Sequence, residues 1–62
     1  MKEILINGCR FWEDGFHSIW NETRIWGTNG KTTEVFFVPD EYLLSEEDFK
    51  KECTRIYNNF FK

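Results

Sequence analysis

Three dipeptides in the first half of the chain constrain its fold more than any other feature: Asn7-Gly8, Asp14-Gly15 and Asn29-Gly30. Asn-Gly and Asp-Gly favour two-residue hairpin turns, because both central residues of a type I′ turn need a positive φ that these residues adopt at least cost. Turns at this spacing predict an antiparallel meander of three or four strands, in which each strand pairs with the next.

The first two turns also predict which side chains share a face. A two-residue loop at Asn7-Gly8 places Ile4 opposite Phe11, and one at Asp14-Gly15 places Phe11 opposite Ser18. Because strand side chains alternate, one face collects apolar residues and is the expected core, whereas the other mixes large rings with polar groups. The predicted core face is Ile4, Ile6, Cys9, Phe11 and Trp20, and the predicted other face is Leu5, Arg10, Trp12, His17 and Ile19.

The register of the third hairpin has two alternatives. A two-residue loop at Asn29-Gly30 pairs Arg24 with Val35, whereas a three-residue loop that begins at Thr28 pairs Arg24 with Glu34. We favour the three-residue loop, because it sets opposite charges across the strands and gives its glycine the left-handed conformation.

A C-terminal helix over about residues 45–61 is the clearest predicted element. It follows Pro39, which ends the last strand because proline cannot donate to the ladder. Ser45 is the expected N-cap, Asp48 its capping-box partner, and Leu44 forms a hydrophobic staple with the helix. The apolar stripe expected to face the sheet is Phe49, Cys53, Ile56, Tyr57 and Phe60, with Phe61 beside it and partly exposed.

These elements predict one α+β domain over residues 1–62, a meander packed by a single helix. Seven Phe, three Trp and two Tyr provide its core, since each ring buries on the order of 150–250 Å². So small a chain has little volume left for a catalytic pocket, which usually needs roughly 300–1,000 Å³. We therefore expect no enzyme and no small-molecule substrate.

The net charge and the absence of targeting signals limit which classes of partner and which cellular location we expect. The net charge of −3 disfavours broad binding to phosphate backbones, although it does not exclude nucleic acid. The first residues lack the apolar region of a signal peptide, and no stretch has membrane-spanning length. We therefore expect a cytoplasmic protein whose Cys9 and Cys53 are reduced and buried, with a disulfide between them as the alternative in an oxidising compartment.

Catalytic and metal chemistry find little support in the sequence. His17 is the single histidine, and the predicted register places Trp12 rather than a carboxylate beside it. With Cys9 and Cys53 it provides three soft ligands, without the close pairs of a structural zinc site. No cofactor, metal or catalytic residue is expected.

A surface for a partner is the stronger expectation, because one helix covers one face of a sheet that carries rings on both. Some of Trp12, Ile19, Trp26 and Phe36 should lie on the uncovered face, where large apolar patches usually mark partner sites. Two acids before the helix, Asp40 and Glu41, have no role at its N-terminus. The candidate partner-binding residues are Arg10, Trp12, His17, Arg24, Trp26, Phe36, Asp40 and Glu41.

The function predicted from these residues is a small non-catalytic protein-binding domain, an inhibitor or regulator of a larger protein. The absence of Ala and the abundance of Phe, Ile, Asn and Lys fit an AT-rich gene, such as one from a phage or mobile element. Two alternatives stay open: a nucleic-acid-binding domain that uses the sheet face, and a homodimeric structural domain.

Overall fold

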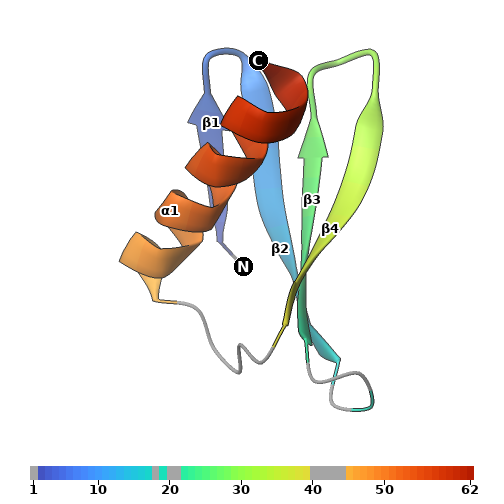
Figure 1. The fold of residues 1–62 in the computed structure, drawn as a ribbon, viewed down its shortest axis with the longest axis vertical. Coiled ribbons are helices and arrows are strands. Elements are labelled where there is room, and N and C mark those ends of the chain that lie inside the picture. The colour runs from blue at the N-terminus through green and yellow to red at the C-terminus, as the bar shows by residue number, and fades with distance from the viewer. Residues whose placement is uncertain (1, 18, 20–21, 40–44) are drawn as a thin grey trace.

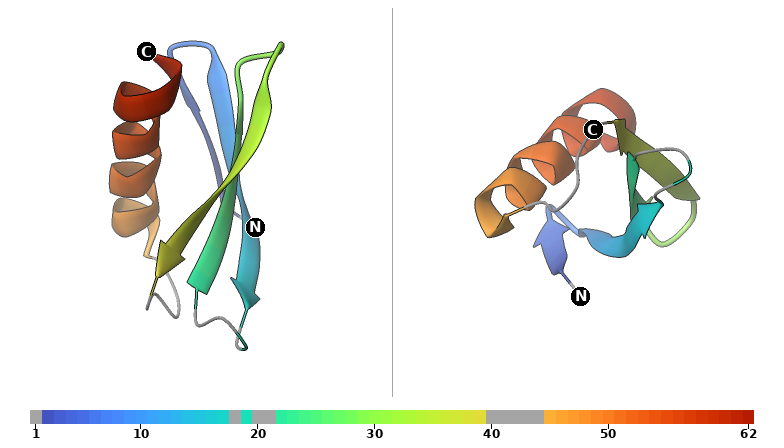
Figure 2. Two further views of the ribbon diagram at one scale, coloured as in Figure 1. Left: turned by 45° about the vertical axis from the view of Figure 1, so that its right-hand side comes forward. Right: turned by 90° about the horizontal axis from the view of Figure 1, so that it is seen from below.

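The structure is a computed structural model that describes residues 2–17, 19, 22–39 and 45–62. Within these residues an antiparallel sheet has the order β1-β2-β3-β4. A helix crosses one face of the twisted sheet, and the other face carries no described element (Figures 1 and 2). The predicted α+β meander is confirmed. Its elements are β1 (Glu3–Ile6), β2 (Cys9–His17), β3 (Glu22–Thr28), β4 (Thr33–Pro39) and α1 (Glu46–Ile56).

The first hairpin has the predicted turn and register. Ile6 pairs with Cys9 and Ile4 with Phe11, so two residues, Asn7 and Gly8, form the loop. Both have a positive φ, 46° and 85°, as a type I′ turn requires. Cys9 and Phe11 are buried, which confirms the predicted core face of this hairpin. Trp20, assigned to the same face, lies outside the described residues.

The predicted turn at Asp14-Gly15 is wrong, because β2 runs through these residues without reversing. Glu13 pairs with Ile25 and Phe16 with Thr23, so Asp14 and Gly15 together oppose one residue of β3. This is a β-bulge, which adds one residue to a strand and bends it. Gly15 has a φ of 91°, so the residue type that favours a turn here serves the bulge instead. As a result Phe11 pairs with Gly27 rather than with Ser18.

The third hairpin differs from both predicted registers. Arg24 pairs with Phe37, and Thr28 pairs with Thr33, so the loop has four residues, 29–32. The Asn29 side chain explains the longer loop, because its Oδ1 accepts from the N–H groups of Lys31 (2.9 Å) and Thr32 (2.7 Å). The loop glycine has the expected positive φ, 92°.

The helix begins as predicted and brings its apolar stripe onto the sheet. Ser45 Oγ accepts from the Asp48 N–H at 3.0 Å, the N-cap bond. Leu44, the predicted staple residue, lies outside the described residues. Phe49, Cys53 and Ile56 are buried and form the core with residues of the sheet, namely Cys9, Phe11, Ile25 and Val38.

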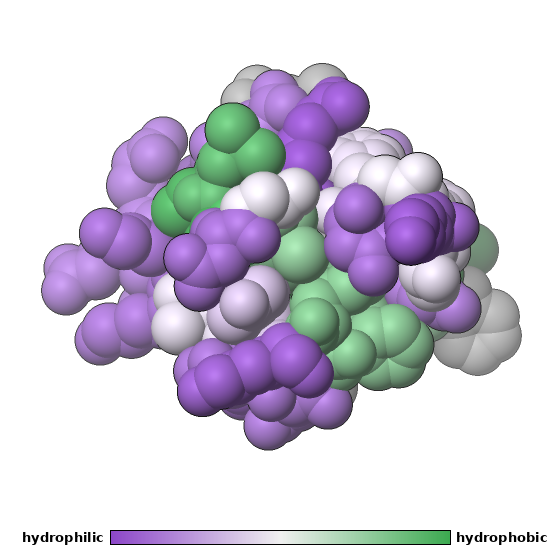
Figure 3. Space-filling view, turned by 90° about the horizontal axis from the view of Figure 1, so that it is seen from above, coloured by the Kyte–Doolittle hydropathy of each residue, from purple (hydrophilic) through white to green (hydrophobic). Residues whose placement is uncertain are grey.

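The last turn of the helix places the rings of Phe60 and Phe61 differently from the prediction. Residues Tyr57–Phe61 form a π-helical turn, closed by the Lys62 N–H donating to the Tyr57 carbonyl at 2.8 Å. This wider turn changes the angular position of the residues that follow Tyr57. Phe61 therefore packs on the core, whereas Phe60, predicted to face the sheet, is 52% exposed. In the view onto this end of the molecule, apolar surface lies open between hydrophilic groups (Figure 3).

Gly27 allows the helix end and the sheet to meet. It is buried in β3 directly opposite Phe11, whose ring lies edge-on to Phe61 with centroids 5.6 Å apart. A Cβ at Gly27 would lie 2.7 Å from Phe11 Cε1 and 3.0 Å from Phe61 Cε2. Both contacts are too short for a methyl group, so any larger residue at this position displaces two core rings.

Replacing Gly27 with alanine should therefore lower the free energy of unfolding by about 1–3 kcal/mol, the usual cost of overpacking a core. Urea denaturation measures it. The matched control is Glu34→Ala, exposed and directly opposite Gly27 on β4, which should change stability by less than about 0.5 kcal/mol. In an open strand Gly→Ala is favourable, so a stabilised Gly27→Ala variant would contradict the predicted clash.

Candidate protein-binding face

The side of the sheet opposite α1, which we call the outer face, carries every second residue of each strand. The residues of this face are identified from the buried ones: Phe11 and Ile25 face the helix, so their neighbours along each strand point the other way. The left view of Figure 2 shows α1 on one side of the sheet only. Among the described side chains, the outer face consists of Glu3, Leu5, Arg10, Trp12, Asp14, Glu22, Arg24, Trp26, Thr28, Thr33, Val35 and Phe37.

Two stacked indoles occupy the centre of the outer face. Trp12 and Trp26 are cross-strand partners, and their rings are nearly parallel, 10° apart with centroids at 6.3 Å. The Arg10 guanidinium lies 4.7 Å from the centroid of the Trp12 ring, a cation–π contact, and also forms an ion pair with Glu3. These contacts hold the two half-buried rings in a defined arrangement, although no described element covers them.

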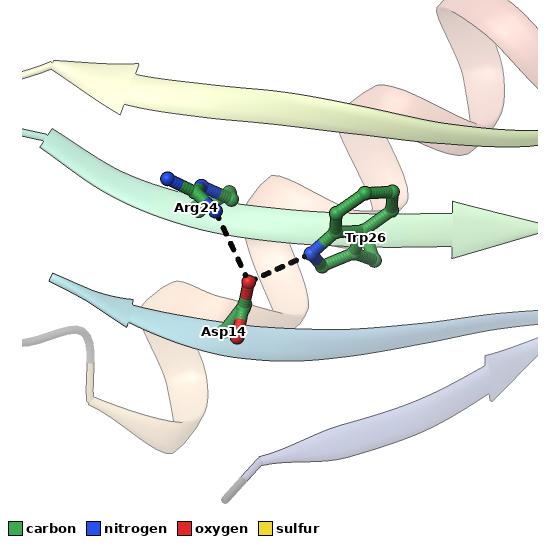
Figure 4. A network of polar contacts seen from close by, with 3 residues as sticks. All are labelled: Asp14, Arg24 and Trp26. Carbon is green, nitrogen blue, oxygen red and sulfur yellow. Dashed lines mark hydrogen bonds and ion pairs between the residues drawn. The ribbon is translucent and has the colours of Figure 1, made fainter. Parts of the chain in front are cut away.

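Asp14 contacts both Arg24 and Trp26 (Figure 4). Its Oδ2 accepts a hydrogen bond from Trp26 Nε1 at 2.9 Å and forms an ion pair with Arg24 Nη1 at 3.4 Å. Asp14 is a bulge residue, so the irregularity in β2 places this carboxylate between its two donors. The Asp14 contacts therefore fix the indole plane and neutralise a cation on the same face.

The most exposed apolar side chains of the outer face lie on its two flanking strands. Leu5 on β1 is 71% exposed and Phe37 on β4 is 46% exposed. The Arg24 guanidinium lies 6.0 Å from the centroid of the Phe37 ring. The indole pair lies on the two strands between them, so apolar groups occur on all four strands of this face.

Four of the predicted binding residues lie on the outer face: Arg10, Trp12, Arg24 and Trp26. Phe36 does not, and its predicted placement is wrong. Its ring packs edge-on against Phe60 (5.2 Å) and Phe61 (6.1 Å), on the helix side of the sheet. The predicted register caused the error, because the longer loop after β3 changes which residue of β4 pairs with each residue of β3.

The remaining predicted residues are only partly covered by the structure. The His17 backbone pairs with Glu22 at the end of β2, and its side chain is not among the parts described. Asp40 and Glu41 lie outside the described residues. Ile19, predicted to lie on a strand, is in the turn after β2 and is 86% exposed.

Sequence reasoning missed Phe37 and Asp14 as members of the face. Phe37 would have been found from the correct register, because it lies opposite Arg24. Asp14 was assigned to a hairpin turn, and nothing in the local sequence separates a turn from a bulge at an Asp-Gly pair. The binding role of each of these residues stays a prediction.

A groove of about 360 Å³ lies between β1 and the start of α1, lined by Glu3, Ile4, Glu46, Glu47, Phe49 and Lys50. It contains no histidine, serine or cysteine. Among the described residues no three His, Cys, Asp or Glu gather as a metal site, and no helix has the length and apolarity to span a bilayer.

The two cysteines are buried, free thiols. Burial raises the pKa of Cys53 to about 12, and the neighbouring Glu52 carboxylate adds to the effect. A thiol with so high a pKa is a poor nucleophile near neutral pH, because the thiolate is the reactive form. Cys53 is thus a core residue on the inner face of α1.

Comparisons with known proteins identify no relative. No protein-family model, no curated protein and no solved structure matches the chain.

Removing the Asp14 carboxylate should loosen the outer face without unfolding the chain. Asp14→Ala leaves Trp26 Nε1 and Arg24 without this acceptor, so we expect a loss of about 1 kcal/mol in urea denaturation and a change in tryptophan fluorescence. Glu3→Gln is the control, because it breaks an exposed ion pair alone and should cost less than about 0.5 kcal/mol. Equal losses in the two variants would contradict the role assigned to Asp14.

The raised pKa of Cys53 predicts that the stability of the fold decreases as pH rises above 9.0. The folded state keeps the thiol proton up to about pH 12, whereas the unfolded chain loses it near the ordinary value of 9.0. The contribution of the protonated Cys53 thiol to the free energy of unfolding is complete below pH 9.0. It is lost as pH rises toward 12, by up to about 1.4 kcal/mol per pH unit. Urea denaturation at several pH values should show a steeper decline for the natural chain than for Cys53→Ala. Parallel declines would contradict it.

Proposed function

We propose that this chain is a small non-catalytic protein-binding domain that docks a larger protein on its outer face. One observation carries the proposal: the outer face presents Leu5, the Trp12–Trp26 pair and Phe37 on four adjacent strands, with no described element over them. Exposed apolar surface of this kind usually marks a partner site. Tryptophan and arginine are also the residues most enriched among the side chains that dominate binding energy at interfaces.

The contacts within the face support binding as well as folding. Stacking, the cation–π contact of Arg10 and the bonds to Asp14 hold the rings in one arrangement before any partner arrives. A surface whose side chains are already ordered loses less conformational entropy on association. The partner expected for it is a protein surface that is mainly apolar at its centre and has polar groups at its rim.

The same contacts favour a protein over a nucleic acid as the partner. The indoles stack on each other and Arg10 covers the Trp12 ring, so part of the aromatic surface that a base would use is occupied. Arg10 and Arg24 form ion pairs with Glu3 and Asp14, so the face lacks the excess of positive charge that phosphates need.

A protein that occupies part of a larger partner's surface can change the partner's activity without chemistry of its own. An inhibitor or regulator is the role that fits these features. The four strands would provide the contact surface, and α1 lies on the opposite side of the sheet (Figure 2).

The test uses a variant that changes the face and leaves the core intact. Leu5→Glu places a carboxylate at the most exposed apolar position of the outer face, where it would be buried without a partner on docking. Immobilised natural chain should capture a partner from a lysate of its source cells, and Leu5→Glu should weaken binding of the purified partner at least about tenfold. Calorimetry or surface plasmon resonance measures the affinities.

The matched control is Thr54→Glu, the same change in charge at an exposed position on α1. It should bind the partner as the natural chain does, and circular dichroism should show that both variants fold. Equal losses in both variants would contradict docking on the outer face. Capture of nucleic acid alone, with binding that weakens steeply as salt rises, would favour the nucleic-acid alternative.

A further inference from the structure

The two edges of the sheet are protected to different degrees. β1 has four residues and is surrounded by charge: its first residue, Glu3, is paired with Arg10 of β2, and Glu46, Glu47 and Lys50 of α1 line the groove beside it. β4 has seven residues and none of Val35–Val38 is charged. It forms the opposite side of the sheet from the start of α1 (Figure 1). Short strands, charges and proline are the usual protection of an edge; β4 is longer than β1, and its one charged residue, Glu34, and its proline, Pro39, lie toward its ends and leave Val35–Val38 unprotected.

The hydrogen-bond pattern shows which backbone groups of β4 are directed outward. The Asn29 N–H donates to the Thr32 carbonyl at 3.2 Å, so this loop-closing pair is hydrogen-bonded. Bonded and non-bonded pairs alternate along an antiparallel ladder, so Glu34, Phe36 and Val38 bond to β3. The N–H and C=O groups of Thr33, Val35 and Phe37 therefore point away from the sheet.

Exposed rings flank this edge on both faces of the sheet. Phe37, 46% exposed, lies on the outer face. Phe60, 52% exposed, lies on the helix side against the Phe36 ring, with centroids 5.2 Å apart. A strand added to β4 would lie beside both rings, and would satisfy the outward backbone groups in the same step.

We propose that the occupant of this edge is β4 of a second copy of the chain, in an antiparallel, two-fold symmetric pairing centred on Val35. In this register Val35 lies opposite Val35 of the second copy, and Thr33 opposite Phe37. All the outward N–H groups of both strands then find carbonyl partners, and Pro39, which has no N–H, stays outside the ladder.

Neighbouring registers satisfy the edge less well. A pairing centred on Phe36 places Pro39 opposite Thr33, so each end pair has one hydrogen bond instead of two and the Thr33 carbonyl finds no donor. A pairing centred on Glu34 places two carboxylates opposite each other across the strands, which is destabilising. The register centred on Val35 avoids both the facing carboxylates and the unpaired Thr33 carbonyl, and every pair within it has two hydrogen bonds.

The proposed pairing also limits its own growth. Once the two β4 strands are paired, the free edges of the continuous sheet are the two β1 strands, which are short and flanked by charge. The assembly therefore closes as a dimer rather than extending into a fibre. This inference is independent of the proposed function, because the outer face of each copy remains open.

The test removes one outward N–H group and leaves every side chain unchanged. A synthetic chain with N-methylated Val35 should dimerise at least about tenfold more weakly than the natural chain, because the symmetric pair of bonds at Val35 is lost. The matched control is N-methylated Leu5. The pair Ile4–Phe11 is in phase with the turn-closing pair Ile6–Cys9, so the Leu5 N–H also points outward, but from the β1 edge. Its dimerisation should be unchanged.

Sedimentation equilibrium over a dilution series measures the association, and circular dichroism checks that each chain folds. Hydrogen exchange gives a second measurement on the natural chain: exchange at the Val35 and Phe37 amides should slow as concentration rises. Val35→Lys replaces the methylated chain if that chain does not fold, and it should be monomeric. A natural chain that stays monomeric, a dimer that survives both changes at Val35, or growth beyond two copies would each overturn the proposal.

Discussion

The contact among Phe11, Gly27 and Phe61 is the interaction on which the two layers of this domain depend. The missing side chain of Gly27 leaves space for a ring of β2 and a ring from the last turn of the helix to meet over β3. The π-helical turn brings Phe61 to that position, whereas a regular helix would have favoured Phe60. One glycine and one irregular turn thus fix where the helix crosses the sheet.

Because the helix lies on one face, the other face must be stabilised by contacts among its own side chains. The outer face does so with stacked indoles, a guanidinium over one ring, and a carboxylate that bonds to the second indole and the second arginine. Each contact keeps large apolar groups in a defined arrangement while they remain accessible. In so small a domain, the same residues can therefore contribute both to stability and to the proposed docking surface.

The sequence predicted the element order, the first hairpin and the start of the helix, because local interactions determine them. The Asn7-Gly8 turn and the Ser45 cap depend only on residues a few positions apart. The bulge at Asp14-Gly15 changed the pairing of β2 with β3, and the longer loop after Thr28 changed the pairing of β3 with β4, so Phe36 was predicted on the wrong face. Arg10, Trp12, Arg24 and Trp26 were placed on the uncovered face despite the wrong pairing, and Phe36 was not.

The nearest-neighbour order of the strands has a consequence for how the chain folds. Every strand pairs with its neighbour in sequence, so the sheet is built from short-range loop closures, which are fast. Packing of α1 on β1 joins the two ends of the chain and closes a far longer loop. The cross-strand pairs of the outer face belong to the rapid events, and sealing of the apolar interior belongs to the late one. The tryptophan pair therefore depends on short loop closures, whereas burial of Cys53 depends on the long one.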